Sequence, residues 1–321
     1  MNNVYKPEGS LIATQRNREL ISSRASLEKA MATGAILEAM ATLCDNDFNI
    51  HVDLGCIKGI IPRSEAAYNN DGSDIKDIAV ITRVGKPVCF KIIGISESCG
   101  KCIALLSRRQ AQIECYNNYI STLIPGDVVN AKVTHLESFG AFCDIGCGAI
   151  SLLSIDSISI SRILHPKDRL FGGMSIRAII KHIDPANGRI FLSTKELLGT
   201  WEENAREFSQ GQTVAGIIRS VESYGVFVEL SPNLAGLAEI KDDLILEDGS
   251  KLDTSAIGKC TAVYIKSIIP ERMKIKLVLI DSYKTKVNSQ ELKYYINEEI
   301  THIDYWRYSP DGAPKLIESI F

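Results

Sequence analysis

The sequence predicts an all-β protein made of three tandem, small Greek-key barrels that are joined by helices. Three observations predict this class. A segment of about 70–80 residues occurs three times, short strands with alternating apolar and polar residues fill each copy, and each copy ends in a late strand pair. The chain has 321 residues, of which 45% are hydrophobic, and this length is enough to build several separate cores.

The repeats are clearest in two stretches that align without gaps. GDVVNAKVTHLESFGAFCDIG begins at residue 126, and GQTVAGIIRSVESYGVFVELS begins at residue 211. A weaker third copy, GAILEAMATLCDNDFNIHVDLG, begins at residue 34. Rings stand at matching positions in the three copies, in chain order Phe48 and His51, Phe139 and Phe142, and Tyr224 and Phe227.

Each copy then continues in a similar way, into CIKGIIP, CGAISLLS or LAGLAEI, and finally into its late strand pair. In the second copy this pair reads GMSIRAIIKHIDPANGRIFLSTK, and its Pro-Ala-Asn-Gly series predicts a hairpin turn.

The alternation around the rings predicts which side chains face each core. We expect the following residues to point inward: Ile50, Val52, Leu54, Ala141, Cys143, Ile145, Val226, Val228 and Leu230. The opposite parity then places His51, Phe142 and Phe227 outside, each followed two residues later by an outward acid, Asp53, Asp144 or Glu229. A ring therefore recurs three times at one outward position.

Helical patterns separate the repeats. Residues from Ser10 to Met31 have apolar residues spaced to share one face, and in the second linker Thr200 precedes two glutamates as a helix N-cap does. For the C-terminal residues we expect a helix followed by a less regular tail. The predicted organisation is an N-terminal helical segment (1–32), a first barrel (33–109), a helical linker (110–123), a second barrel (124–196), a helical linker (197–209), a third barrel (210–281) and a C-terminal extension (282–321).

Charge and composition limit the classes of function. The whole chain has a net charge of −3, and none of the three repeats differs from neutrality by more than one charge, so nucleic-acid binding would depend on stacking more than on phosphate contacts. No apolar run is long enough to span a bilayer. The N-terminal stretch does not resemble a signal peptide, and nine cysteines, an odd number, indicate reduced thiols, so we expect a cytoplasmic protein.

The sequence favours neither a metal site nor an enzyme. CGKC, residues 99–102, has zinc-ligand spacing, but no second pair of ligands lies at a suitable distance, and Cys143 occupies a core position that valine holds in the other copies. His182 lies near Asp184, yet no nucleophile, phosphate loop or carboxylate cluster accompanies them. We therefore expect no cofactor and no catalytic residue.

The second repeat, with SFGAF followed by DPANGRIFLS, resembles the RNA-binding repeat of the bacterial ribosomal protein S1 family, and the joint LLGTWEENA resembles joints in its Gram-positive relatives. The resemblance covers roughly residues 33–281 and is strongest in the second repeat. It implies three five-stranded OB-fold barrels that bind single-stranded RNA by stacking unpaired bases on rings while basic side chains meet phosphates. The RNA-binding residues that it implies are Phe139, Phe142, Lys132, Asp184, Arg189, Tyr224, Phe227, Lys274, Phe48 and His51.

Other positions refine this picture. Gly140 and Gly225 lie between the rings, where a missing side chain would let RNA backbone approach. The family commonly has a histidine where this chain has Pro62, Ser154 or Glu239, and Glu239 would repel phosphate. For His51, a local hydrogen bond is as good an interpretation as stacking. Arg63, Arg108 and Arg109 are phosphate candidates, with isolated surface arginines as the equal alternative.

The resemblance implies a non-enzymatic cytoplasmic protein that captures messenger RNA for translation at or near the small ribosomal subunit, with the first repeat and the N-terminal helix free to contact protein. Two alternatives stay open: a protein-interaction scaffold that has lost RNA binding, and an accessory subunit of an RNA-processing or decay complex.

Overall fold

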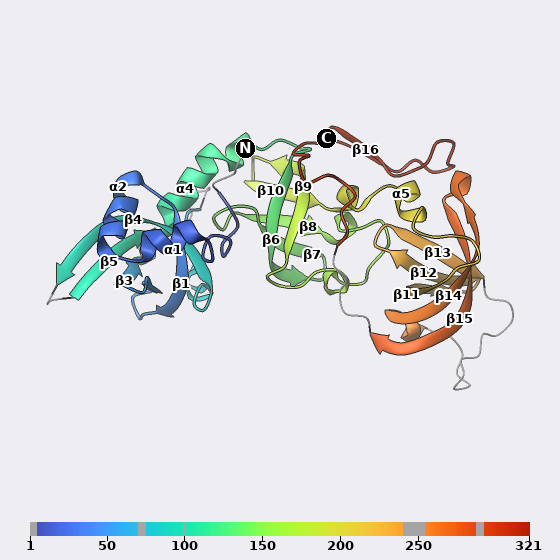
Figure 1. Ribbon diagram of the computed structural model, residues 1–321, viewed down its shortest axis with the longest axis horizontal. Helices are drawn as coiled ribbons and strands as arrows, with labels where there is room; N and C mark the ends of the chain where they lie inside the picture. Colours follow the sequence, from blue (N-terminus) through green and yellow to red (C-terminus); the bar gives the residue numbers. More distant parts are fainter. Residues whose placement is uncertain (1–4, 70–74, 99–100, 240–253, 287–291) are drawn as a thin grey trace.

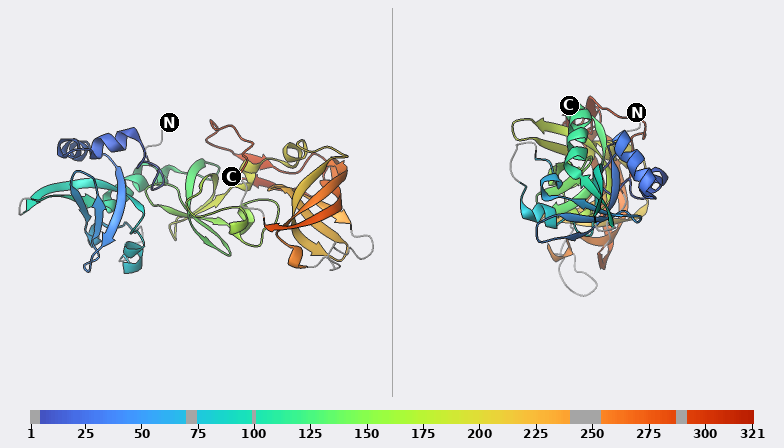
Figure 2. Two further views of the ribbon diagram at one scale, coloured as in Figure 1. Left: turned by 60° about the horizontal axis from the view of Figure 1, so that its bottom comes forward. Right: turned by 90° about the vertical axis from the view of Figure 1, so that its left-hand side faces the viewer.

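A computed structural model describes residues 5–69, 75–98, 101–239, 254–286 and 292–321. It contains three closed five-stranded barrels, as the repeats predict, and they follow one another in a row (Figure 1). The end-on view in Figure 2 shows the three barrels overlapping, so the row is nearly straight.

All three barrels have the same topology. Around each barrel the strands are neighbours in the order first, second, third, fifth and fourth. The third and fifth strands pair in parallel, and this pairing closes the barrel. Barrel 1 consists of β1 (Leu37–Cys44), β2 (Ile50–Asp53), β3 (Lys58–Ile61), β4 (Pro87–Ser98) and β5 (Lys101–Ser107). Barrel 2 consists of β6 (Val128–Glu137), β7 (Gly140–Asp144), β8 (Ile150–Ser154), β9 (Ser175–Asp184) and β10 (Arg189–Ser193). Barrel 3 consists of β11 (Thr213–Glu222), β12 (Gly225–Ser231), β13 (Leu234–Glu239), β14 (Lys259–Ile269) and β15 (Lys274–Lys286).

The predicted alternation is confirmed on the second strand of every barrel. The inward residues of β2, β7 and β12 are buried, and only Leu230 at the end of the set is half-buried. Each barrel has its own apolar core. The hairpin turn predicted from Pro-Ala-Asn-Gly is also confirmed, since Asp184 at the end of β9 pairs with Arg189 at the start of β10.

Short helices flank the barrels. Near the N-terminus, α1 (Gln15–Ile21) and α2 (Arg24–Thr33) pack on barrel 1, where Leu27 of α2 is fully buried. The first linker contains α4 (Arg108–Asn118), and the second contains α5 (Trp201–Ala205), for which Thr200 and Glu203 form a complete capping box. The remaining helical turns are α3 (Asp77–Ile81), η1 (Arg63–Glu65), η2 (Ile120–Thr122), η3 (Ile155–Ser157), η4 (Pro166–Asp168), η5 (Lys195–Leu198), η6 (Thr254–Ala256) and η7 (Pro270–Arg272).

A buried polar cluster, which we call the first joint, connects barrel 1, α4 and barrel 2. The carboxylate of Glu8 accepts hydrogen bonds from Nε and Nη2 of Arg108 at 2.7 and 3.0 Å, and its backbone N–H donates to Asp144 at 2.7 Å. Arg83 and the backbone N–H of Cys89, both from barrel 1, also donate to Glu8. Burial alone would raise the pKa of Glu8, but Arg108 outweighs it and holds this pKa below its usual range.

A second joint connects barrels 2 and 3. Arg169, after η4, donates to Glu229 on β12, and Nε of Arg219 donates to the same carboxylate at 2.7 Å. Asp168 completes this cluster through Arg219 at 3.3 Å. In barrels 2 and 3 the acid two residues after the outward ring therefore points out of its barrel, as expected, but is buried by the joint, whereas Asp53 of barrel 1 is exposed.

The prediction of a helix in the C-terminal extension is wrong for the described residues 292–321. This segment runs without α-helix along barrels 2 and 3 and ends in a two-stranded sheet of β16 (Tyr305–Arg307) and β17 (Glu318–Ile320) (Figure 1). Its backbone pairs with other parts of the chain: Val128 donates to Thr301 and Trp201 donates to Tyr308. The guanidinium of Arg177 binds several of its carbonyl groups, so these tertiary bonds replace the internal bonds of a helix.

We expect Arg108→Met to destabilise the chain by about 3–5 kcal/mol, because the substitution leaves the Glu8 carboxylate buried without its main partner. Urea unfolding that resolves the transitions of the separate barrels measures this loss. The matched control is Arg109→Met, since Arg109 is exposed on the same helix and its replacement should change stability by less than about 0.5 kcal/mol. Equal stability of the two variants would contradict the structural role of the first joint.

A second prediction concerns Glu38, a buried residue of β1 whose Oε2 accepts backbone hydrogen bonds from Gly9, Leu11 and Ile12. Burial raises the pKa of Glu38 from 4.5 to about 7, so between these values the folded chain holds the proton more tightly than the unfolded chain. Its contribution to stability is therefore present below pH 4.5 and is lost as pH rises to about 7, by up to about 3 kcal/mol.

Stability curves between pH 4.5 and 8 measure this effect as the difference in slope between the wild type and Glu38→Gln, which cannot titrate at this position. Glu28→Gln, at a half-exposed helix position, is the control and should keep the wild-type slope. Parallel curves for the wild type and Glu38→Gln would show that folding does not raise the pKa of Glu38.

Candidate nucleic-acid interface

The rings of barrel 2 form a compact exposed pair. Phe139 lies in the turn between β6 and β7 and is 53% exposed, while Phe142 points outward from β7 and is half-buried. Their ring centres are 6.0 Å apart and their planes are perpendicular. Both rings therefore lie on one outer surface of barrel 2, where exposed ring area could stack with a base.

Barrel 3 repeats this pair. Tyr224 is 59% exposed, and its ring lies 6.2 Å from that of Phe227, again at 90°. The two equivalent pairs therefore agree in exposure, separation and angle, although they belong to different barrels.

Barrel 1 differs. The guanidinium of Arg63 lies over the ring of Phe48, 5.3 Å from its centre, and the imidazole of His51 hydrogen-bonds Asp45 at 3.0 Å. The hydrogen bonds from His51 and from Asn49 lower the pKa of Asp45 to about 2. The local hydrogen bond of His51, one of the two interpretations of the sequence, is therefore formed, and both rings of barrel 1 already have partners within the chain.

Asp184 and Arg189 face each other across the β9–β10 turn. The carboxylate of Asp184 accepts from the backbone N–H groups of Ala186 and Asn187 and from the Asn187 side chain, and the Asn187 bonds lower its pKa. Asp184 therefore stabilises the turn that presents Arg189. In barrel 3, Lys274 pairs with Ile269 as Arg189 pairs with Asp184, so Lys274 lies at the equivalent position and is exposed.

Lys132 does not join the rings. It pairs with Asp144 near the opposite end of the β6–β7 ladder, and its amine donates to the carbonyl of Glu8 at 3.2 Å. This lysine is held at the first joint.

Two other expectations for this surface are wrong. Arg108 is only 4% exposed and belongs to the first joint, so it is not free to meet phosphate, whereas Arg109 beside it is exposed. Gly140 is needed inside the barrel, since a Cβ there would lie 2.5 Å from the carbonyl oxygen of Leu153 on β8. Gly225 is confined in the same way by Ala238, so these glycines allow close strand packing and do not open a path for RNA backbone.

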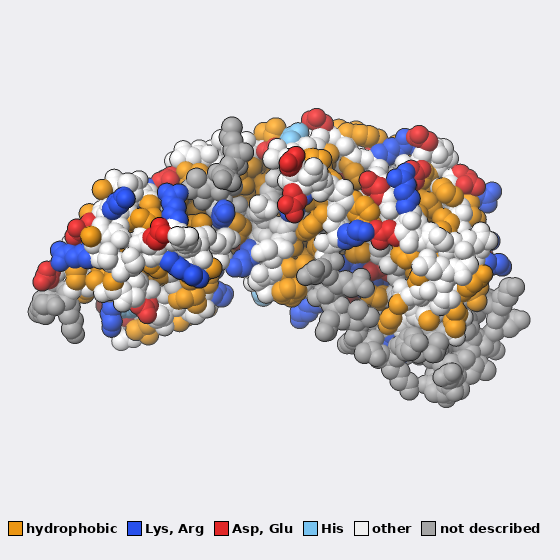
Figure 3. All heavy atoms as spheres, in the orientation of Figure 1, with side chains coloured by type: hydrophobic (Ala, Val, Ile, Leu, Met, Phe, Trp, Pro, Cys, Tyr) orange, Lys and Arg blue, Asp and Glu red, His pale blue; other side chains and the backbone are white. Residues whose placement is uncertain are grey.

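The negative charge of Glu239, near the rings of barrel 3, is balanced by a lysine. Glu239, which the sequence suggested would repel phosphate, forms an ion pair with Lys276 at 3.5 Å. On the face shown in Figure 3, cationic and anionic side chains are interspersed and form no continuous basic stripe. This distribution agrees with the small net charge of each repeat.

A row of side chains across all five strands of barrel 2 could not be predicted from the sequence pattern. Cross-strand register places five outward residues side by side, in the order His135, Phe142, Leu152, Phe191 and His182. The rings of His135 and Phe142 stack at 6.4 Å, and those of His182 and Phe191 stack at 6.0 Å. Alternation in RIFLS marks Phe191 as outward, but only the register shows that it is next to Leu152.

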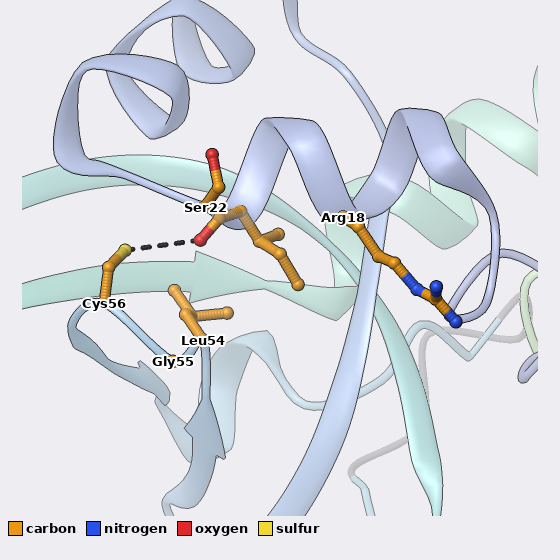
Figure 4. A pocket seen from close by; sticks show the side chains of 6 residues that line it. Arg18, Ser22, Leu54, Gly55 and Cys56 are labelled. Carbon is orange, nitrogen blue, oxygen red and sulfur yellow. Dashed lines mark hydrogen bonds between the residues drawn. The ribbon is translucent and has the colours of Figure 1, made fainter.

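A hollow lies between α1 and the β2–β3 turn. It is lined by Arg18, Ile21, Ser22, Leu54, Gly55 and Cys56, and the Cys56 thiol donates to the Ile21 carbonyl (Figure 4). The guanidinium of Arg18 points away from the other side chains, so no polar groups converge on a ligand. Among the described residues no cluster of three potential metal ligands occurs, and Cys99 of CGKC lies outside those residues.

Comparison with known proteins shows which domain family barrel 2 resembles. Residues 122–195, which contain all of barrel 2, match the S1 RNA binding domain. This chain contains an S1 domain. The match covers the barrel in which the sequence resemblance is strongest, and the two barrels that flank this S1 domain have the same topology.

Longer relatives share most of the chain. The small ribosomal subunit protein bS1 homolog of Bacillus subtilis is 26% identical over 302 residues, which is 92% of this chain and 76% of the relative. The bS1 protein of Staphylococcus aureus is 27% identical over 274 residues, covering 84% of this chain and 67% of the relative. A multidomain protein of Streptococcus pneumoniae with nucleic acid binding domains is structurally similar at 15% identity and a TM-score of 0.24, covering 77% of this chain and 73% of that one. The family assignment depends on the sequence matches alone.

None of the helices in the described ranges is both long and apolar enough to cross a membrane.

We expect Asp184→Ala to destabilise barrel 2 by about 1 kcal/mol, because the turn loses an acceptor for three hydrogen bonds at an exposed site. Thermal or urea unfolding measures this change. Glu271→Ala removes an exposed acid from the corresponding turn of barrel 3 and should leave stability within about 0.5 kcal/mol. If Asp184→Ala leaves stability unchanged, the hydrogen bonds of this carboxylate do not support the turn.

Proposed function

We propose that this protein binds single-stranded RNA through barrels 2 and 3 and that messenger RNA is its ligand in translation, at or near the small ribosomal subunit. The observation that carries this proposal is the exposed, perpendicular ring pair that recurs at the same place in both barrels. The four rings belong to no apolar core, so their exposed area is available to unpaired bases, and stacking contributes about 1–3 kcal/mol per base.

The ribosomal part of the proposal is supported by the bS1 relatives, which align with 84–92% of this chain. In this proposal the protein is non-enzymatic and cytoplasmic, needs no cofactor, and has small-subunit proteins among its partners. Near-neutral barrels suit a ligand that is held by stacking and released easily, since a strongly basic surface would bind any nucleic acid at low salt.

The boundaries of the binding units follow from the same proposal. Barrel 2 with its flanking residues (124–196) and barrel 3 (210–281) would each act as one RNA-binding unit, with residues 197–209 as the linker between them. Tandem units on a short linker gain affinity because the second binding event is intramolecular.

Protein contact is a second candidate function, and one observation favours it for barrel 1. Barrel 1 has an outer cross-strand row equivalent to the row of barrel 2 that starts at His135 and ends at His182. It consists of Leu43, His51, Ile60, Leu105 and Gly94. Leu43 is 55% exposed and Leu105 is 40% exposed, so this surface is aliphatic where that of barrel 2 is aromatic. Residues 33–109 with the preceding segment (1–32) would then bind a protein partner.

The test is the affinity of the full chain for a fluorescent U-rich single-stranded RNA and for an RNA duplex of the same length, measured by anisotropy. We expect the wild type to prefer the single strand. Phe142→Ala combined with Phe227→Ala should weaken binding at least tenfold, since one stacked base is lost in each barrel.

The matched control is Tyr264→Ala combined with Tyr305→Ala, which removes two exposed rings outside the pairs and should leave the affinity unchanged. A wild type that binds neither RNA, or that prefers the duplex, would refute the function. If the ring-pair variant binds like the control, the RNA site is elsewhere, and the scaffold alternative gains support.

A further inference from the structure

Barrel 2 has an outward ring that the paired rings do not include. Phe191 is half-buried on β10, between Ile190 and Leu192, which point into the core. Its neighbours across the ladder are Leu152 on β8 and His182 on β9, and the imidazole of His182 stacks on the Phe191 ring. The core is closed without Phe191, because the residues on either side of it fill the barrel interior.

The distance between Phe191 and the ring pair fits a short stretch of RNA. Phe142 and Phe191 both neighbour Leu152, so two strand spacings, about 10 Å, separate them. Stacked bases in a helix rise about 3.4 Å per step, so two bases on these rings cannot stack on each other. A single intervening nucleotide over the apolar Leu152 spans the distance at about 5 Å per step, which is an extended conformation of a single strand.

We propose that Phe191, backed by His182, is a second base-stacking position of barrel 2, so that this barrel holds three consecutive unpaired nucleotides across Phe142, Leu152 and Phe191. This inference rests on the proposed RNA binding and specifies the ligand of that surface. Single-stranded RNA with its bases free is the required ligand class, because a duplex cannot separate consecutive bases over this distance without unstacking.

The other barrels provide a comparison within the chain. At the position of Phe191, barrel 3 has Lys276 and barrel 1 has Leu105, and at the position of His182 they have Ser267 and Gly94. The second stacking position therefore exists in barrel 2 alone among the three. Lys276 can approach a phosphate but offers no ring face, so barrel 3 would hold one base where barrel 2 holds two.

The experiment compares Phe191→Ala with the wild type on two probes, a nine-nucleotide oligo(U) and an abasic RNA of the same length, using fluorescence anisotropy. On oligo(U) we expect a loss of affinity of roughly fivefold to 150-fold, which corresponds to one stacked base. On abasic RNA we expect no loss beyond twofold, because the backbone alone cannot stack.

Two further variants keep this result interpretable. Phe191→Trp preserves a ring face and should retain the wild-type affinity for oligo(U), which ties the loss to the ring, while unchanged binding of Phe191→Ala to abasic RNA shows that this variant is folded. Tyr264→Ala removes an exposed ring from β14, outside the row, and should leave both probes unaffected.

The possible failures are distinguishable. If wild type does not bind oligo(U), the proposed function itself fails. If Phe142→Ala weakens binding but Phe191→Ala matches Tyr264→Ala, the function stands and the second stacking position is overturned. An equal loss on oligo(U) and on abasic RNA would also overturn it, because the ring would then act on the backbone or on the fold.

Discussion

Closing five short strands into a barrel constrains everything else in this molecule. In such a small barrel one parity of each strand must fill the interior, as Val52, Cys143 and Val228 do at equivalent positions, and so cannot meet a ligand. Chemical differences among the three barrels are therefore confined to the outward parity. The five positions of one cross-strand row illustrate this: the row is mostly aliphatic in barrel 1, aromatic in barrel 2 and mixed in barrel 3.

The same strand that carries the outward ring also anchors its barrel to the preceding part of the chain. Asp144 follows Phe142 by two residues and is held by Glu8 at the first joint, and Glu229 follows Phe227 by two residues and is held by Arg169 at the second. Residues two apart on a strand point to the same side, so the ring and the acid share the outer surface of their barrel. The orientation of each ring pair is thereby fixed relative to its neighbouring module by a buried charge cluster, which is costly to break.

Internal repetition was sufficient to predict the three barrels, their inward residues and the places of the ring pairs, because these depend on local alternation. Contacts between distant residues were not predictable in this way. The bond between Glu8 and Arg108 joins residues 100 positions apart, and nothing near Glu8 in the sequence distinguishes it from a surface acid. The neighbours of Phe191 depend on the register of the strand ladders. This register shifts between Val133 and His135 and again between Phe191 and Leu192, and periodicity alone does not locate such shifts. The C-terminal extension was misassigned because its backbone bonds to barrel 2 are tertiary and override local propensity.

The joints bear directly on how weak modules could act together on one RNA. With flexible linkers, the gain from a second module depends on an effective concentration that falls as the linker lengthens. Here Glu229 binds arginines from both sides of the joint, so barrels 2 and 3, and with them the two ring pairs, are held in a fixed relative orientation. Preorganisation lowers the entropy lost when both barrels bind, but it also restricts the strand to paths that match the fixed orientation. An extended single strand can adapt to such a path, whereas a duplex cannot, so fixed joints are consistent with the proposed preference for unpaired RNA.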